Sequence, residues 1–389
     1  MKTASSPFHI ASLDGMRALA IMIVFLSHAG LSHVVPGLFG VTVFFFLSGY
    51  LITTLLRMEC ERTGTVNMGQ FFLRRALRIL PPFYLVLGVI ALLHGSDWRA
   101  LTAQALFAAN VWEISGGVQP PGTEILWSLA VEEHFYLLFP FLYLGLRRWL
   151  PERRHQFIAL MTMCAAVLAW RMILVHGLSA IDLHSGSAHH PRTCHGTDTR
   201  LDGLLFGCAL AVWGNPALDG TRISQRGWLW LMLPPCVIAL LASFVVRDPA
   251  FRETWRYTVQ GLALMPVFIV VIRFASAWPF RFLNWAWVRR VGVLSYAFYL
   301  THSLVIALVK NWLPGSMLAR GVAAFGITLL LSWLMHVLIE RPCAGLRRRI
   351  GRHDDKNSAE HLQIPPCDRS VPFGTPPQHG PPTPHSALA

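Results

Sequence analysis

Apolar residues of the chain fall into ten runs of about 16 to 23 residues, separated by short polar segments. A helix needs about 20 predominantly apolar residues to cross a bilayer. We therefore predict an all-α polytopic integral membrane protein with about ten transmembrane helices. An eleventh run, residues 100–112, is too short to cross alone, and we expect it to be re-entrant or interfacial. The ten predicted crossings are residues 13–35, 38–57, 79–96, 124–146, 157–177, 199–214, 228–246, 257–275, 292–312 and 319–340.

Charge distribution sets the expected topology. Only 14% of the residues are charged, and the net charge of +13 comes from basic clusters between the apolar runs. Placing these clusters in the cytoplasm satisfies the positive-inside rule with both N- and C-termini cytoplasmic, although the basic loop 247–256 then lies outside. We expect a multi-pass protein of the cell inner (cytoplasmic) membrane, with the lipid bilayer and no nucleic acid as partner. The clusters are Arg74–Arg78, Arg147–Arg154, Arg222–Arg226, Arg281–Arg290 and Arg347–Arg349.

The end of the chain has a different composition. From residue 346 on, basic residues and prolines replace the apolar runs. We divide the chain into a membrane domain, residues 1–345, and a cytoplasmic tail, residues 346–389, expected to be disordered.

Cysteine and histidine patterns do not predict a metal centre. The seven cysteines show no CxxC spacing, and the histidines between residues 184 and 195 lack the regular spacing of a metal site. We expect no bound metal.

Two ionisable residues lie in the first apolar run. Arg17 and His28 are eleven residues apart, which places them on one helix face and about 16 Å apart along its axis. An ionisable side chain inside a membrane span is costly and usually functional. Asp14, three residues before Arg17, is expected to pair with it at the inner end of the helix.

A carboxylate pair occurs at a similar depth in another run. Glu132 and Glu133 are neighbours, so their side chains point about 100° apart and at least one should face the protein interior. A carboxylate beside His28 would orient the imidazole and raise its basicity, as a general base requires. A structural ion pair has the same appearance in sequence and stays open.

An arginine cluster precedes the third run. Arg75 and Arg78 share a helix face, and the following Pro81 and Pro82 indicate a helix entry. Guanidinium groups bind phosphate bidentately, so this cluster could hold a phosphorylated cofactor. Further candidates for substrate contact or structural pairing are His302, Glu340, and Arg200 with Asp202. For the last two, a pair near the outer surface and ordinary loop charges are both open.

Seven segments of the chain, between about residues 9 and 345, resemble the membrane acyltransferase-3 family in the family's order. This family includes O-antigen, exopolysaccharide, Nod-factor and macrolide O-acyltransferases. One such motif would be weak support, whereas seven in order are strong. The segments are SLDGMRALAIMIVFLSH, GVTVFFFLSGYLITTLL, RRALRILPPFY, WSLAVEEHFYLLFP, TRLDGLLFG, LSYAFYLTHSLV and the terminal ERP.

The resemblance implies a reaction. Members take an acyl group, most often acetyl, from cytoplasmic acyl-CoA and transfer it to a hydroxyl of a saccharide-type acceptor: a cell-surface polysaccharide, a glycolipid or a glycosylated metabolite. It also implies that Arg17, His28, Arg75 and Arg78 are required. Acyl-CoA is then a co-substrate, and no tightly bound cofactor is expected.

The residues and the resemblance combine into one hypothesis. Arg75 and Arg78, with Arg17, would hold the phosphates of acyl-CoA, and the pantetheine arm would bring the thioester to His28. His28, oriented by Glu132 or Glu133, would deprotonate the acceptor hydroxyl. Direct transfer and a transient acyl-enzyme are both open. The alternative is a proton-coupled transporter or flippase of a saccharide or lipid-linked substrate that uses the same charges.

Overall fold

The computed structural model describes residues 9–95, 97–177 and 190–347, and all contacts below lie within residues 9–345. The described residues form helices and connecting loops and contain no strand. The first half contains α1 Ala11–Leu26, η1 Ser27–Leu31, α2 Gly37–Thr63, α3 Met68–His94, α4 Trp98–Ala105, α5 Ala109–Ile114, α6 Leu126–Trp149 and α7 Arg153–Gly177. The second half contains α9 Pro191–Cys194, α10 Thr197–Val212, α11 Gln225–Gly227, η2 Trp228–Met232, α12 Leu233–Val245, α13 Pro249–Glu253, α14 Trp255–Arg273, η3 Phe280–Asn284, α15 Ala286–Val293, α16 Ser295–Trp312, α17 Met317–Met335 and η4 His336–Glu340.

The all-helical membrane class is confirmed. Within the described residues, eight helices are long and apolar enough to cross a bilayer, and α15 with α16, bent by 70° at their junction, would make a ninth. Helix α10 corresponds to the predicted crossing 199–214, but its 16 residues extend only about 24 Å, less than the hydrocarbon core. The run 100–112 forms the short helices α4 and α5, neither of which can cross alone. The predicted tail lies outside the described residues from residue 348 on.

Helix α3 corrects one predicted boundary. It begins at Met68, eleven residues before the predicted start, with the Asn67 side chain accepting a hydrogen bond from the Gln70 backbone. Pro81 and Pro82 therefore lie inside the helix and do not mark its entry. Proline is tolerated within membrane helices. The carbonyls that Pro81 and Pro82 leave without an amide donor are those of Leu77 and Arg78, and the Tyr296 hydroxyl of α16 donates to the next carbonyl, that of Ile79 (2.9 Å).

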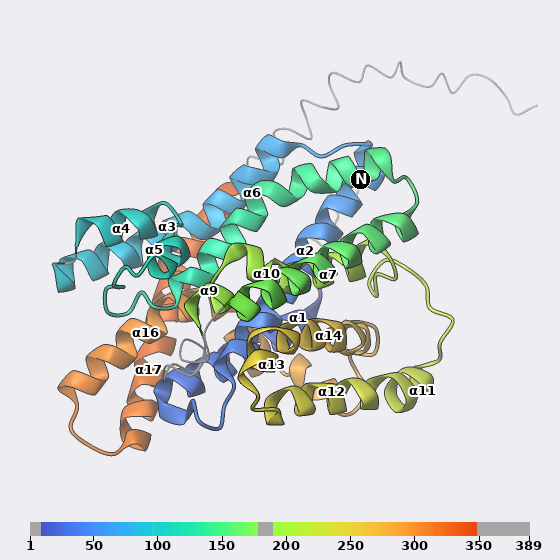
Figure 1. Ribbon diagram of the computed structural model, residues 1–389. Coiled ribbons are helices and arrows are strands. Elements are labelled where there is room, and N and C mark those ends of the chain that lie inside the picture. The colour runs from blue at the N-terminus through green and yellow to red at the C-terminus, as the bar shows by residue number, and fades with distance from the viewer. Residues whose placement is uncertain (1–8, 96, 178–189, 348–389) are drawn as a thin grey trace, which may run out of the picture. The chain divides into compact units, whose positions relative to one another are not determined.

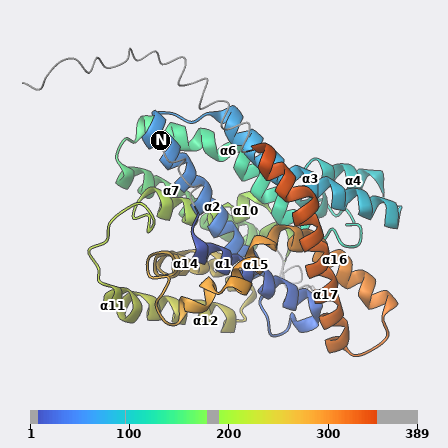
Figure 2. The same ribbon diagram turned by 180° about the vertical axis from the view of Figure 1, so that it is seen from behind.

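Helices α2 and α10 pack with their backbones in direct contact at the centre of the bundle (Figure 1). A Cβ on Gly49 would lie 2.0 Å from the Leu204 carbonyl oxygen, and one on Gly207 would lie 2.1 Å from that of Phe46. Small residues permit such close approach where lipid supplies no hydrophobic force between helices. Seen from behind, α1 runs beside α15 (Figure 2), where Gly292 allows the same approach to the Asp14 backbone.

A buried ion pair ties α7 to α10. Arg171 Nη1 and Nη2 donate to the two carboxylate oxygens of Asp202 at 2.9 and 2.7 Å, and Nη2 also donates to Thr258 of α14. Both side chains of the pair are at most 1% exposed. The predicted pairing of Asp202 with Arg200 is therefore wrong, because residues two apart on a helix point about 200° away from each other.

Arg200 instead lies among aromatic rings. Its guanidinium is 3.8 Å from the centre of the Tyr257 ring and within 6 Å of the Phe45 and Trp127 rings. Nη2 donates to Thr42 (3.1 Å), while Nη1 has no hydrogen-bond partner among the described residues. Cation–π attraction stabilises a desolvated guanidinium of this kind by about 2 kcal/mol.

We predict that Gly207→Ala destabilises the fold. The added Cβ would overlap the Phe46 carbonyl, so α2 and α10 must separate, at a cost of about 1–3 kcal/mol. Thermal unfolding in detergent should show a lower Tm than wild type. The matched control is Gly326→Ala on α17, where a Cβ meets open space and Tm should be unchanged or raised. Equal Tm values for the two variants would contradict the close packing.

We also predict that Arg171→Met destabilises the protein by about 3–5 kcal/mol, since it leaves the Asp202 carboxylate buried without its partner. The double variant Arg171→Met/Asp202→Leu should recover most of this loss. Arg154→Met, at an exposed position on the same helix, is the control. Unfolding in a denaturing detergent titration measures all three, and a double variant less stable than the single one would refute the assignment.

Candidate active site

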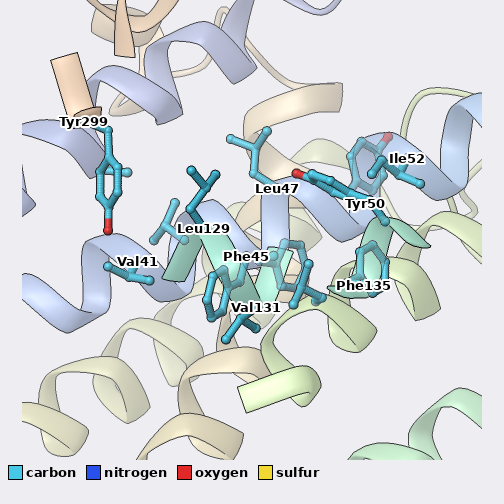
Figure 3. Close-up of a cluster of buried hydrophobic side chains, with 14 of the residues drawn as sticks. Val41, Phe45, Leu47, Tyr50, Ile52, Leu129, Val131, Phe135 and Tyr299 are labelled. Atoms are coloured by element: carbon cyan, nitrogen blue, oxygen red, sulfur yellow. The ribbon is translucent and has the colours of Figure 1, made fainter. Parts of the chain in front are cut away.

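A cavity of about 800 Å³, counting the part open to solvent, lies between α1, α2, α3, α6 and α16. Much of its wall is apolar, and Figure 3 shows Val41, Leu47, Leu129 and Tyr299 of this wall within the buried hydrophobic cluster. The polar lining includes three arginines and one carboxylate. These residues are Arg17, Arg75, Arg78 and Glu132.

The three arginines come from two helices. Arg17 on α1 pairs with Asp14 (3.3 Å), which also contacts His9, as the spacing of Asp14 and Arg17 predicts. Arg75 on α3 lies over the Tyr136 ring, 5.3 Å from its centre. Arg78, three residues further on, shares the lining face with Arg75 as the spacing predicts. The wall therefore carries more positive than negative charge, which suits an anionic ligand.

Arg74 shows that this placement is specific. It precedes Arg75 in the sequence but points elsewhere, and it pairs with Glu59 of α2 at 3.1 Å with 40% of its side chain exposed. Of the three arginines at the start of α3, Arg75 and Arg78 line the cavity and Arg74 does not.

Glu132 lies at the arginine end of the site and does not contact His28. It accepts hydrogen bonds from Ser48 (3.0 Å) and Tyr136 (2.8 Å). Glu133 Oε1 is buried without a hydrogen-bond partner among the described residues. The prediction that Glu132 or Glu133 orients His28 is therefore wrong. The reason is tertiary: α6 presents these carboxylates toward α2 and α3, where Ser48 and the arginines lie.

His28 pairs with His302. His28 Nδ1 lies 2.9 Å from His302 Nε2, and His302 Nδ1 lies 2.7 Å from the Tyr299 carbonyl oxygen. His28 sits in η1, a π-helical segment that contains Gly30 at φ +111°. Such segments are frequent at functional sites. The sequence presented His302 only as a further polar residue in a span, and the structure makes it the partner of His28.

Tyr299 contacts both the cavity and the histidine pair. Its ring lines the cavity, its hydroxyl lies 2.6 Å from Ser128 Oγ and donates to the Ile125 carbonyl, and its own carbonyl faces His302. His28 is not part of the cavity lining. Tyr299 and His302 are three positions apart and so share a helix face, which is the sequence signal that places them side by side.

Glu340 and the neighbour of Glu133, His134, make contacts away from the cavity. Glu340 pairs with His336 (2.6 Å) within η4, which agrees with a structural role. His134 contacts Thr197 of α10 (2.8 Å). Neither residue lines the cavity.

His195 belongs to the histidine-containing loop, of which His184 and His189 lie outside the described residues. It stacks on Trp127, with ring centres 4.4 Å apart, and lies 3.0 Å from the Glu113 carboxylate. Burial alone would lower the pKa of His195, but Cys194 and Glu113 outweigh it and raise this pKa to about 9. Among the described residues, no group of three or more histidines, cysteines or carboxylates is placed to hold a metal ion.

Comparison with known proteins identifies relatives. A family described as an acyltransferase domain matches residues 10–337. The chain is similar to peptidoglycan O-acetyltransferase OatA of Listeria monocytogenes, with 28% identity over 87% of this chain and 56% of the relative. It is also similar to O-acetyltransferase OatA of Staphylococcus aureus, with 29% identity over 79% and 52%. The chain thus spans about half the length of these relatives. No solved structure matches.

Proposed function

Because the chain belongs to the membrane acyltransferase-3 family, whose acyltransferase domain covers residues 10–337, we propose that it transfers an acetyl group from acetyl-CoA to a hydroxyl of a saccharide-type acceptor. One observation carries the proposal: a single cavity gathers Arg17, Arg75 and Arg78 and ends at Tyr299, beside the His28–His302 pair. The relatives are O-acetyltransferases, which supports the reaction class.

The arginine end of the cavity suits the donor. Acyl-CoA carries a pyrophosphate and a ribose phosphate, and three guanidinium groups can bind these through charge-assisted, bidentate hydrogen bonds. The apolar wall between Val41 and Tyr299 suits the pantetheine arm. With the N-terminus in the cytoplasm, Arg17 faces the cytoplasmic side, where acyl-CoA is available.

The histidine supplies the base. His28 Nε2 takes the proton of the acceptor hydroxyl, and the hydroxyl oxygen attacks the thioester carbonyl carbon. The carbon–sulfur bond then breaks, and the leaving CoA thiolate receives the proton from His28. Because His28 is not among the residues that line the cavity, the site must rearrange before the thioester reaches Nε2.

The acceptor enters from the other side. His28 lies about 16 Å from Arg17 along α1, toward the outer end in the predicted topology. An acceptor hydroxyl on the outer face of the cytoplasmic membrane could meet it there. The protein would thus carry acetyl groups from a cytoplasmic donor to a cell-surface saccharide without a resident cofactor.

We predict that Arg75→Gln and Arg78→Gln each weaken acetyl-CoA binding by about 10- to 100-fold, because each removes a charge-assisted contact of about 1.5–3 kcal/mol. Equilibrium binding to protein in nanodiscs measures the effect. Arg74→Gln is the matched control and should leave affinity within twofold of wild type, because Arg74 points away from the cavity. Equal losses in all three variants would mean that only general surface charge matters.

We predict that His28→Ala and His28→Gln reduce acetyl transfer by about 10²–10⁴-fold while acetyl-CoA still binds. Radiolabelled acetyl-CoA outside proteoliposomes, with soluble peptidoglycan fragments inside, measures transfer. His33→Ala, at an exposed position on the same side, is the control. Variants that transfer at the wild-type rate would reject His28 as the base. Movement of saccharide without thioester consumption would favour the transporter.

A further inference from the structure

We propose that His302 is a positioning residue that fixes His28 in the tautomer with a bare Nε2. This inference rests on the proposed function, in which His28 Nε2 is the base. It begins with His302 itself, which is 0% exposed within α16. Its Nδ1 lies 2.7 Å from the Tyr299 carbonyl oxygen. A carbonyl oxygen only accepts hydrogen bonds, so Nδ1 of His302 must carry its hydrogen.

His302 is neutral. Its contacts are the Tyr299 carbonyl, the His28 imidazole and the rings of Phe298 and Tyr299. None of these contacts supplies a negative charge, and an unpaired buried imidazolium is costly. The carboxylate of Glu124 lies near His28, but it accepts a hydrogen bond from Ser303 (2.9 Å) and not from His302. With one hydrogen on Nδ1, His302 Nε2 therefore carries a lone pair and acts as an acceptor.

The tautomer of His28 follows. Its Nδ1 lies 2.9 Å from the His302 lone pair, which requires the hydrogen of this contact to come from His28. A neutral imidazole with its hydrogen on Nδ1 has a bare Nε2. The chain of contacts from the Tyr299 carbonyl through His302 to His28 thus leaves the base nitrogen free to take a proton.

This arrangement favours the charged form that arises in the reaction. When His28 gains a proton on Nε2, its Nδ1–H bond to His302 becomes charge-assisted and strengthens. The interaction is therefore stronger as the reaction proceeds than in the resting state, which lowers the barrier. His302 serves here in the place that a carboxylate takes in many histidine sites, without adding a negative charge to the membrane interior.

The packing around the pair holds its geometry. Phe25 of α1 contacts Phe298 of α16 and Phe325 of α17 edge to face, which fixes the helices that carry the two histidines. Gly30 closes the π-helical turn of His28 against Met317, where a Cβ would lie 2.6 Å from the sulfur. Since Tyr299 also lines the donor cavity, one residue touches both the donor space and the positioning residue.

Two measurements test the inference: the protonation of the His28 ring nitrogens and the rate of acetyl transfer. Magnetic resonance of ring-¹⁵N-histidine protein in lipid bilayers distinguishes bare from protonated ring nitrogens, and subtraction of the His28→Gln spectrum assigns His28. We expect a protonated Nδ1 and a bare Nε2 on His28 in wild type. His302→Ala should release this preference, whereas His302→Gln should keep it, because its amide oxygen can accept the same hydrogen.

Kinetics give the second readout. His302→Ala should lower kcat for acetyl transfer by about 10- to 100-fold while the KM for acetyl-CoA stays unchanged. His302→Gln should retain most of the rate, and the control His33→Ala should match wild type.

A bare Nδ1 on wild-type His28, or a His302→Ala spectrum identical to wild type, would overturn the inference. The wild-type spectrum decides even if His302→Ala fails to fold. A wild-type protein that consumes no acetyl-CoA would refute the proposed function and leave the tautomer result standing.

Discussion

A bilayer interior has no water to solvate polar groups, and this constraint shapes the whole bundle. A charged or hydrogen-bonding side chain inside is costly unless it finds a partner in the protein or faces a polar cavity. Asp202 is neutralised by Arg171, Arg200 is enclosed by aromatic rings, and His28 bonds to His302. The helices are thereby held in one arrangement, because each of these contacts joins different helices.

The same constraint separates the donor end of the site from its base. The arginines of α1 and α3 share one cavity, where they can be offset by an anionic ligand. His28 lies beyond α1, in η1, where it forms a hydrogen-bonded pair with His302. Tyr299 joins the two regions through its ring and its carbonyl. This separation suits the proposed donor, acetyl-CoA, which carries its charged phosphates at one end and its uncharged pantetheine arm at the other.

Sequence reasoning succeeded where the relevant contacts are local to one helix. The period of 3.6 residues placed Arg75 and Arg78 on one face and paired Asp14 with Arg17. Long apolar runs identified the membrane class and most of the helices. It failed for Arg200 with Asp202, for Glu132 with His28, and for the start of α3. The Arg200–Asp202 error lies within one helix and ignored the angle between residues two apart. The Glu132–His28 error concerns a contact between helices, where similar depth in the membrane does not make two residues neighbours.

The sequence by itself determined that the chain is a helical membrane protein, and its ordered motifs indicated the family. It also determined which residues share a helix face, because apolar run length and helical period are properties of the chain. Only the tertiary structure decided that His302 is the partner of His28, that Arg171 neutralises Asp202, and that Tyr299 bounds the cavity. Those pairings depend on which helices lie side by side, and this is set by backbone approach at residues such as Gly49 and Gly207. No periodicity within a single helix specifies its neighbour.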